Sequence, residues 1–376
     1  MCQSCQSIAP RKKLDFSPED ILDFTHSKYH NELLRFKEPH FAFWEITHSC
    51  NLRCTHCGLA AGKPKKDELA TDDALALIDN ISESDTKVLM ILGGEPLLRN
   101  DFLEIAEYAG RRFELVVCTN GVLIDRDYAK NLKETGIWVM GISLEGATAK
   151  THDSIRGGGS FERAIKGIKN CLEIGLQVCV MHTVSKANIH ELPDLLKLTQ
   201  DFDINCFEVT DFLPFGRGEN ISDQTLTKEQ RKWMCEYLAE RRFRAESPVA
   251  SLPDDPFWFI TYNEEFMQNC FDPYSDVMVI GDAGGILNYG IKPNGKVIPF
   301  PTLRVEIGDL REKSLREIWK SSEIIANLRE RENLKGRCGS CEYKFVCGGN
   351  RGVAYYYSRD MMAEDPRCWY EPSLNA

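Results

Sequence analysis

Short apolar runs that alternate with helical segments constrain this 376-residue chain more than any other feature. Six runs rich in β-branched and aromatic residues recur, and segments with helical spacing separate them. Strands that alternate with helices form parallel sheets, because each helical crossover returns the chain to the same edge. We expect an α/β fold, either an open doubly wound sheet or a partial barrel. The predicted strands are Phe41–Thr47, Val88–Leu92, Leu115–Cys118, Val139–Leu144, Val178–Val184 and Cys206–Phe212.

Charge and composition exclude several classes of function. The 57 acidic residues outnumber the 46 Lys and Arg, and a net charge of −11 argues against general binding to nucleic acid or an anionic membrane. No apolar run approaches the roughly 18 residues of a membrane span, and no secretory signal is present. We therefore expect a cytoplasmic protein with no nucleic-acid or membrane partner. In that reducing compartment, clustered members of its 15 cysteines should be metal ligands or redox groups.

Three cysteines follow the first predicted strand with the spacing C-x3-C-x2-C. Cys50, Cys54 and Cys57 lie in a loop at the carboxyl end of that strand. Three thiolates without a fourth protein ligand leave one metal position open, and in a four-iron cluster the open iron can bind another molecule. A structural zinc site is the alternative, although such sites usually have two C-x2-C pairs.

Glycine-rich and polar motifs occur at the ends of the next strands. Gly93, Gly94 and Glu95 end the second strand, where glycines let the backbone approach a ligand and a carboxylate can accept from an ammonium group. Further along lie a strand-end amide, a strand-end hydroxyl and a guanidinium in a glycine-rich loop. These are Asn120, Ser143 and Arg156. Each residue taken alone is also consistent with an ordinary turn or helix cap.

A second group of cysteines lies near the C-terminus. Its spacing is C-x2-C-x5-C, followed by twenty intervening residues and a fourth cysteine. Four ligands complete a closed site, which suits electron transfer or structural bracing, and a zinc ribbon is the competing interpretation. The four residues are Cys338, Cys341, Cys347 and Cys368.

The other cysteines have weaker signals. Those within predicted strands or on a helix face are expected to be isolated buried thiols. They are Cys118, Cys171, Cys179 and Cys206. Cys2 and Cys5 form a C-x2-C pair, for which a mobile thiol pair is favoured over a third cluster.

The first cysteine motif and the strand-end motifs together resemble the radical S-adenosylmethionine (SAM) superfamily. The resemblance implies that Cys50, Cys54 and Cys57 hold a [4Fe–4S] cluster whose open iron binds SAM. Reduction would cleave SAM to methionine and a 5′-deoxyadenosyl radical that abstracts a substrate hydrogen. An electron donor such as flavodoxin or ferredoxin is expected, and no further catalytic residue is predicted. The implied SAM contacts are Gly93, Gly94, Glu95, Asn120, Ser143 and Arg156, the last pairing with the SAM carboxylate.

The C-terminal cysteines resemble the SPASM extension of that superfamily and its shorter twitch relatives, which carry auxiliary iron–sulfur clusters. The resemblance implies one auxiliary [4Fe–4S] cluster on the four C-terminal cysteines. A second cluster is not expected, because Phe300 and Asn350 stand where relatives carry cysteines. The predicted domains are an N-terminal lead over 1–40, a partial (β/α)6 barrel over 41–247 and a small irregular iron–sulfur domain over 248–376.

The layout is most similar to the radical SAM enzymes of alternative haem and haem d1 biosynthesis, which alter side chains of a tetrapyrrole. We therefore expect hydrogen abstraction from a tetrapyrrole side chain. A maturase of a ribosomally made peptide is one alternative, although about 40 residues before the first strand are too few for a leader-binding domain. A non-catalytic iron–sulfur electron carrier is the other.

Overall fold

The computed structural model describes residues 37–204, 206–243 and 284–373. The Cys2–Cys5 pair and the predicted domain boundary at residues 247 and 248 lie outside these ranges. Within them, no helix combines the length and apolar character needed to cross a bilayer.

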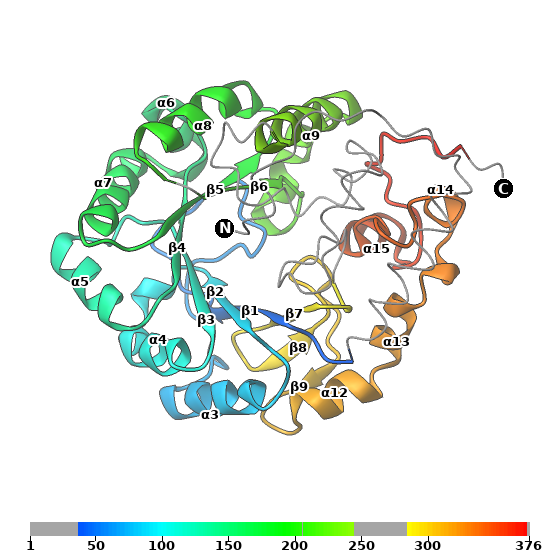
Figure 1. Cartoon of the computed structure of the whole chain (residues 1–376), viewed down its shortest axis with the longest axis horizontal. Helices are drawn as coiled ribbons and strands as arrows, with labels where there is room; N and C mark the ends of the chain where they lie inside the picture. Colours follow the sequence, from blue (N-terminus) through cyan, green and yellow to red (C-terminus); the bar gives the residue numbers. More distant parts are fainter. Residues whose placement is uncertain (1–36, 205, 244–283, 374–376) are drawn as a thin grey trace.

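Six parallel strands form the predicted sheet and curve as a partial barrel, with their helices on the outside (Figure 1). This confirms the α/β class and favours the barrel over the open sheet. The strands are β1 (Phe41–Thr47), β2 (Val88–Gly93), β3 (Glu114–Thr119), β4 (Val139–Ser143), β5 (Val178–Val184) and β6 (Phe207–Asp211). The helices are α3 (Thr71–Ser82), α4 (Phe102–Gly110), α5 (Arg126–Glu134), α6 (Ala149–Arg156), α7 (Ser160–Glu173), α8 (Leu192–Asp201) and α9 (Lys228–Phe243).

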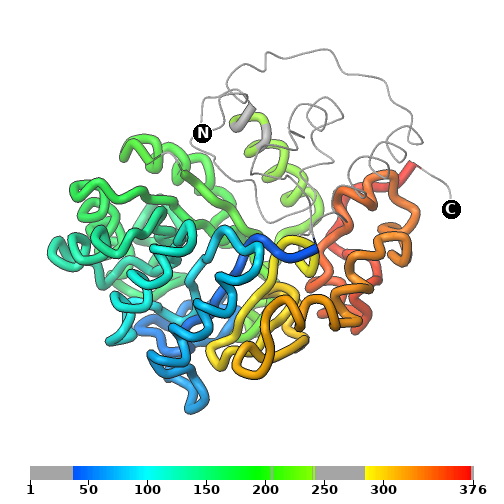
Figure 2. Tube along the Cα trace, turned by 60° about the horizontal axis from the view of Figure 1, so that its bottom comes forward, coloured from blue at the N-terminus to red at the C-terminus, as the bar shows by residue number. Residues whose placement is uncertain are grey.

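The sheet continues into the C-terminal region, which the sequence pattern did not indicate. β7 (Asn288–Ile291) pairs in parallel with β1, and the antiparallel strands β8 (Lys296–Ile298) and β9 (Gly308–Asp309) extend the edge. Figure 2 shows this yellow segment against the blue start of the barrel. The C-terminal helices are α12 (Leu315–Ser321), α13 (Glu323–Arg329), α14 (Gly336–Gly339) and α15 (Arg351–Ser358).

Strand β1 separates the apolar core from the interior of the barrel. Ala42, Trp44 and Ile46 are fully buried in a core that extends from the barrel into the C-terminal region. Side chains alternate between the two faces of a strand, so Phe43 and Glu45 point to the other side. The inner face of the barrel is therefore where polar groups of this strand can act.

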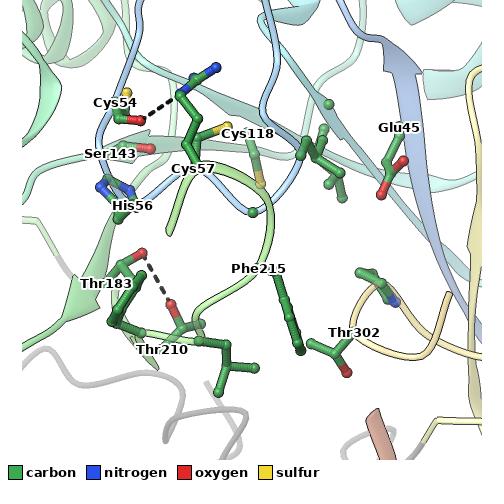
Figure 3. Close-up of a pocket in the computed structure, with 18 of the residues that line it drawn as sticks. Glu45, Cys54, His56, Cys57, Cys118, Ser143, Thr183, Thr210, Phe215 and Thr302 are labelled. Carbon is green, nitrogen blue, oxygen red and sulfur yellow. Dashed lines mark hydrogen bonds between the residues drawn. The ribbon is translucent and has the colours of Figure 1, made fainter. Parts of the chain in front are cut away.

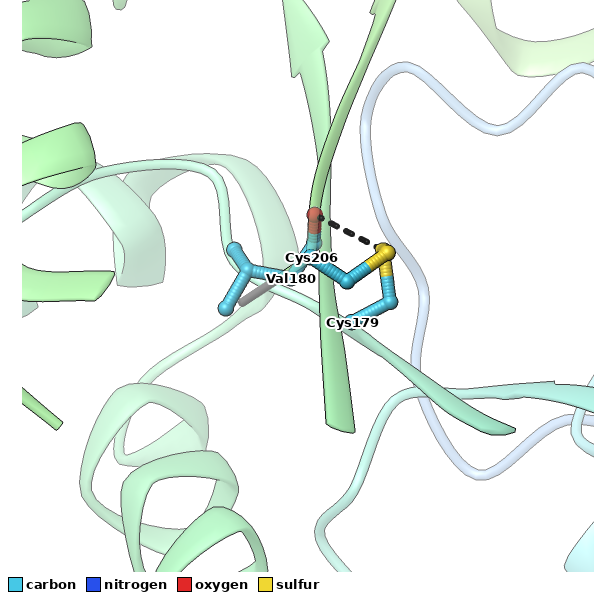
Figure 4. Close-up of a disulfide and its surroundings, with 3 residues drawn as sticks. All are labelled: Cys179, Val180 and Cys206. Carbon is cyan, nitrogen blue, oxygen red and sulfur yellow. Dashed lines mark hydrogen bonds between the residues drawn. A yellow bond between two sulfur atoms is a disulfide. The ribbon is translucent and has the colours of Figure 1, made fainter. Parts of the chain in front are cut away.

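The expectation of isolated thiols is wrong for Cys179 and Cys206, which form a disulfide (Figure 4). Cys179 lies in β5 and Cys206 directly precedes β6, and the Val180 N–H donates to the Cys206 carbonyl at 2.9 Å. The parallel pairing of β5 with β6 brings these two positions together. Cys118 and Cys171 are free thiols.

Candidate active site

A cavity of about 420 Å³ opens at the carboxyl ends of the barrel strands. In parallel α/β folds this edge is where ligands bind. The barrel side of its wall includes Glu45, Cys50, Cys54, Cys57, Gly93, Gly94, Asn120, Ser143, Arg156, Thr183 and Asp211. The C-terminal region contributes Phe300, Thr302, Arg304, Asn350 and Arg367. Figure 3 shows Cys54 and Cys57 at one side of this space and Thr302 at the other.

Neighbouring segments hold the cysteine loop in place. The Gly94 N–H donates to the Thr47 carbonyl at 2.7 Å, and a Cβ on Gly94 would lie 2.1 Å from the Ser49 carbonyl oxygen. From the loop after β6, Arg217 Nε donates to the Cys54 carbonyl at 3.0 Å. The end of β2 can approach the loop this closely because Gly94 has no side chain.

The buried carboxylate of Glu145, at the end of β4, organises a cluster of charged and polar groups that sequence reasoning missed. Arg156 donates to Glu145 Oε1 through Nε at 3.0 Å and Nη2 at 2.6 Å. His56 Nε2 lies 3.4 Å from the same oxygen, and the Thr183 N–H donates to Oε2 at 2.9 Å. Burial opposes ionisation, but the charge of the Arg156 guanidinium outweighs it and holds the pKa of Glu145 well below its usual range.

Arg156 lines the cavity, and two of its nitrogens are bound to Glu145. Its third nitrogen, Nη1, lies 3.9 Å from Cys54 Sγ. The structure thus places a cation beside one of the three thiols, where it would stabilise a thiolate. Pairing of this nitrogen with the SAM carboxylate stays a prediction.

Glu95 lies behind the cavity wall instead of on it. Its carboxylate is fully buried and accepts from Thr119 Oγ1 at 2.7 Å and from the Asn120 N–H at 2.8 Å. This carboxylate is thus bound to the end of β3, and a contact of Glu95 with SAM stays a prediction. Asn120 and Ser143 do line the cavity.

His56, between the second and third cysteines, has a polar atom available to a ligand. Its Nε2 faces Glu145, and its buried Nδ1 has no hydrogen-bond partner among the described residues. Burial lowers the pKa of His56 to about 4, so the ring is neutral and Nδ1 can accept a hydrogen bond. A buried acceptor left unpaired costs about 1–3 kcal/mol. Three thiols and this acceptor fit a cluster with an open iron and a ligand that carries N–H or O–H groups.

The four C-terminal cysteines surround a second cavity of about 20 Å³. The Gly349 N–H approaches Cys347 Sγ at 3.5 Å, and Arg351 Nη2 lies 3.7 Å from Cys338 Sγ. Such donors to sulfur are typical of iron–sulfur sites. Four thiols around one small cavity fit an iron–sulfur cluster, which cysteine thiolates hold.

Phe300 and Asn350, the two departures from the SPASM pattern, lie on the wall of the larger cavity. Phe300 packs edge-on against Phe43 with ring centroids 5.2 Å apart, and Thr302 Oγ1 lies 3.5 Å from Asn350 Oδ1. Among the described cysteines, Cys118 is the remaining one on either cavity wall. That there is one auxiliary cluster and no second one stays a prediction.

Known proteins match both parts of the chain. A family model for the radical SAM superfamily matches residues 44–199, and one for the SPASM iron–sulfur cluster-binding domain matches residues 285–342. The chain belongs to the radical SAM superfamily. It is therefore an enzyme that uses SAM and a [4Fe–4S] cluster, with a C-terminal domain that binds iron–sulfur clusters.

Two curated relatives come from Methanosarcina barkeri. The chain is 34% identical to an AdoMet-dependent heme synthase, covering 89% of this chain and 97% of that protein. It is 32% identical to an Fe-coproporphyrin III synthase, covering 94% of each. Streptococcus suis SuiB, solved with bound S-adenosylmethionine, shares the fold with a TM-score of 0.73 at 18% identity, covering 94% of this chain and 84% of that chain.

Proposed function

We propose that this enzyme abstracts a hydrogen from a side chain of a tetrapyrrole in haem-type cofactor biosynthesis. The cluster and SAM supply a 5′-deoxyadenosyl radical when bound. The residues of the chain hold these groups, orient the substrate and exclude water. The names of the Methanosarcina barkeri relatives support this assignment.

The observation that carries the proposal is the composition of the cavity wall. It combines apolar rings with cationic side chains, and a flat apolar macrocycle with acidic substituents requires both. The apolar group comprises Phe212, Leu213, Phe215 and Phe300, and the cations are Arg156, Arg217, Arg304 and Arg367.

Three sets of residues have proposed roles. Cys50, Cys54 and Cys57 hold the catalytic cluster. SAM contacts Gly93, Gly94, Asn120, Ser143, Arg156 and His56, while Glu95 positions the end of β3. Cys338, Cys341, Cys347 and Cys368 hold one auxiliary [4Fe–4S] cluster. We also propose a flavodoxin or ferredoxin as electron donor and a cytoplasmic location.

The test is a turnover assay with reconstituted, reduced protein, SAM and iron coproporphyrin or a sirohaem-derived tetrapyrrole. We expect deoxyadenosine and a mass change in one tetrapyrrole. Cys54→Ala should abolish both, whereas Cys171→Ala, which removes a thiol buried on α7 away from the cavity, should retain both. Deoxyadenosine formation that no tetrapyrrole affects, without a mass change, would contradict the proposal. A mass change in a candidate precursor peptide would favour the maturase alternative.

A further inference from the structure

An ion pair inside the cavity joins the first barrel strand to the C-terminal region. Glu45 lies on β1, and Arg304 lies between β8 and β9, 259 residues away in the sequence. Arg304 Nη1 donates to Glu45 Oε1 at 2.5 Å, and Nη2 donates to Oε2 at 2.9 Å. Two parallel hydrogen bonds of this kind fix the plane of the guanidinium group.

The two partners differ in exposure. The Glu45 side chain is 3% exposed, whereas that of Arg304 is 36% exposed and lines the cavity. Nη1 also donates to the Pro301 carbonyl at 3.4 Å. The Nε–H and one Nη2–H of Arg304 therefore have no acceptor among the described residues.

The other cavity arginines are engaged more fully by the protein. Arg367 donates to Asp365 and to Asp211, and its side chain is 8% exposed. Arg156 is bound by Glu145, and Arg217 by backbone carbonyls of the cysteine loop. Arg304 is the cavity arginine that combines a fixed orientation with exposed donors.

A structural role alone gives little reason for this pair. The free-energy cost of removing two charges from water offsets most of their mutual attraction. Apolar residues of similar size in the same place often stabilise a protein to the same extent or more. The segment that carries Arg304 is already anchored, because Leu303 is buried and its N–H donates to the Phe300 carbonyl at 3.0 Å. The Glu45–Arg304 pair is therefore not needed to hold this segment in place, which points to a role other than stability.

We propose that Arg304 binds a carboxylate of the substrate and that Glu45 positions Arg304 to do so. The inference rests on the proposed function, because the tetrapyrroles in question carry acidic side chains. One edge of the guanidinium binds Glu45 and another remains available for a second carboxylate. The bound carboxylate would fix which side chain of the macrocycle faces the cysteine loop.

The test measures binding of coproporphyrin and of its tetramethyl ester to the reconstituted protein with SAM, by absorbance titration. Arg304→Gln should weaken binding of the acid at least tenfold, with Arg304→Lys intermediate, and leave binding of the ester within twofold. KM for the turned-over tetrapyrrole should rise more than kcat falls. Arg311→Gln is the matched control, because Arg311 is an exposed C-terminal arginine that pairs with Asp309 outside the cavity.

A further variant separates loss of substrate binding from misfolding, because Arg304→Gln alone leaves the buried Glu45 carboxylate unpaired. The double variant Glu45→Gln/Arg304→Gln removes both charges and should show the same selective loss of affinity for the acid. Equal losses for acid and ester, or no loss in either variant, would overturn the inference and leave the proposed function standing. A wild-type protein that neither binds nor converts any tetrapyrrole would refute the proposed function, and the inference with it.

Discussion

Glu145 shows how much of this active site depends on a single carboxylate. It binds Arg156 and contacts His56, which both line the cavity beside the cysteine loop. Glu145→Gln leaves the buried Arg156 guanidinium without its counter-charge, so we expect a loss of about 3–5 kcal/mol in stability and a loss of SAM cleavage. Urea unfolding and deoxyadenosine assays check this. Glu107→Gln, at an exposed pair with Arg111, should change stability by less than about 1 kcal/mol, and equal effects of the two variants would contradict the prediction.

His152 makes the stability of the folded protein depend on pH. Its Nδ1 accepts from the Glu145 N–H at 3.1 Å, and burial lowers the pKa of His152 from 6.5 to about 4. Below pH 6.5 the unfolded chain binds a proton that the folded chain does not, so stability falls as the pH drops toward 4. His152→Asn is the comparison, because its amide oxygen can replace Nδ1 as the acceptor. Between pH 8 and pH 5 the free energy of unfolding of the wild type should fall by about 2 kcal/mol more than that of His152→Asn. Superimposable pH profiles in urea unfolding would refute this.

At the scale of elements, the end of β2 determines the shape of the cysteine loop. In Gly94→Ala the new methyl group would meet the Ser49 carbonyl, so β2 or the loop must move. We expect lower iron content after reconstitution and weaker SAM binding, measured by iron analysis and equilibrium binding. Gly158→Ala is the control, because a Cβ there meets nothing within 4 Å. Retention of full iron content and SAM affinity by Gly94→Ala would contradict this role of the glycine.

Elements and their ends were predictable, whereas contacts between distant segments were not. Hydrophobic runs identified all six barrel strands, and because parallel strands end at one edge, the cysteine loop and Ser143 were expected near each other. Glu145 follows Ser143 by two residues, but no motif distinguished it from an ordinary strand-end carboxylate. The partnership of Glu45 with Arg304 depends on the pairing of β7 with β1, and local periodicity carries no information about that pairing.

At the scale of the whole molecule, we expect the barrel and the C-terminal region to fold as one unit. β1 has β2 on one side and β7 on the other, and Tyr289 of β7 is fully buried in the common core. A fragment that ends at residue 243 would expose β1 as an apolar edge strand, so we expect it to aggregate. Size-exclusion chromatography and circular dichroism of fragment and full chain check this. A monomeric fragment that binds iron would show that the barrel folds alone.

The position of β7 also affects how the chain folds as it is synthesised. β1 leaves the ribosome early, and its second neighbour follows ~240 residues later, a delay on the order of 10 to 50 seconds at usual elongation rates. During that interval Glu45 has no arginine partner and lies in the middle of the apolar strand Phe41–Thr47. A charge at such a place discourages pairing with strands of other chains. The carboxylate that later orients Arg304 would thus first protect the nascent protein from aggregation.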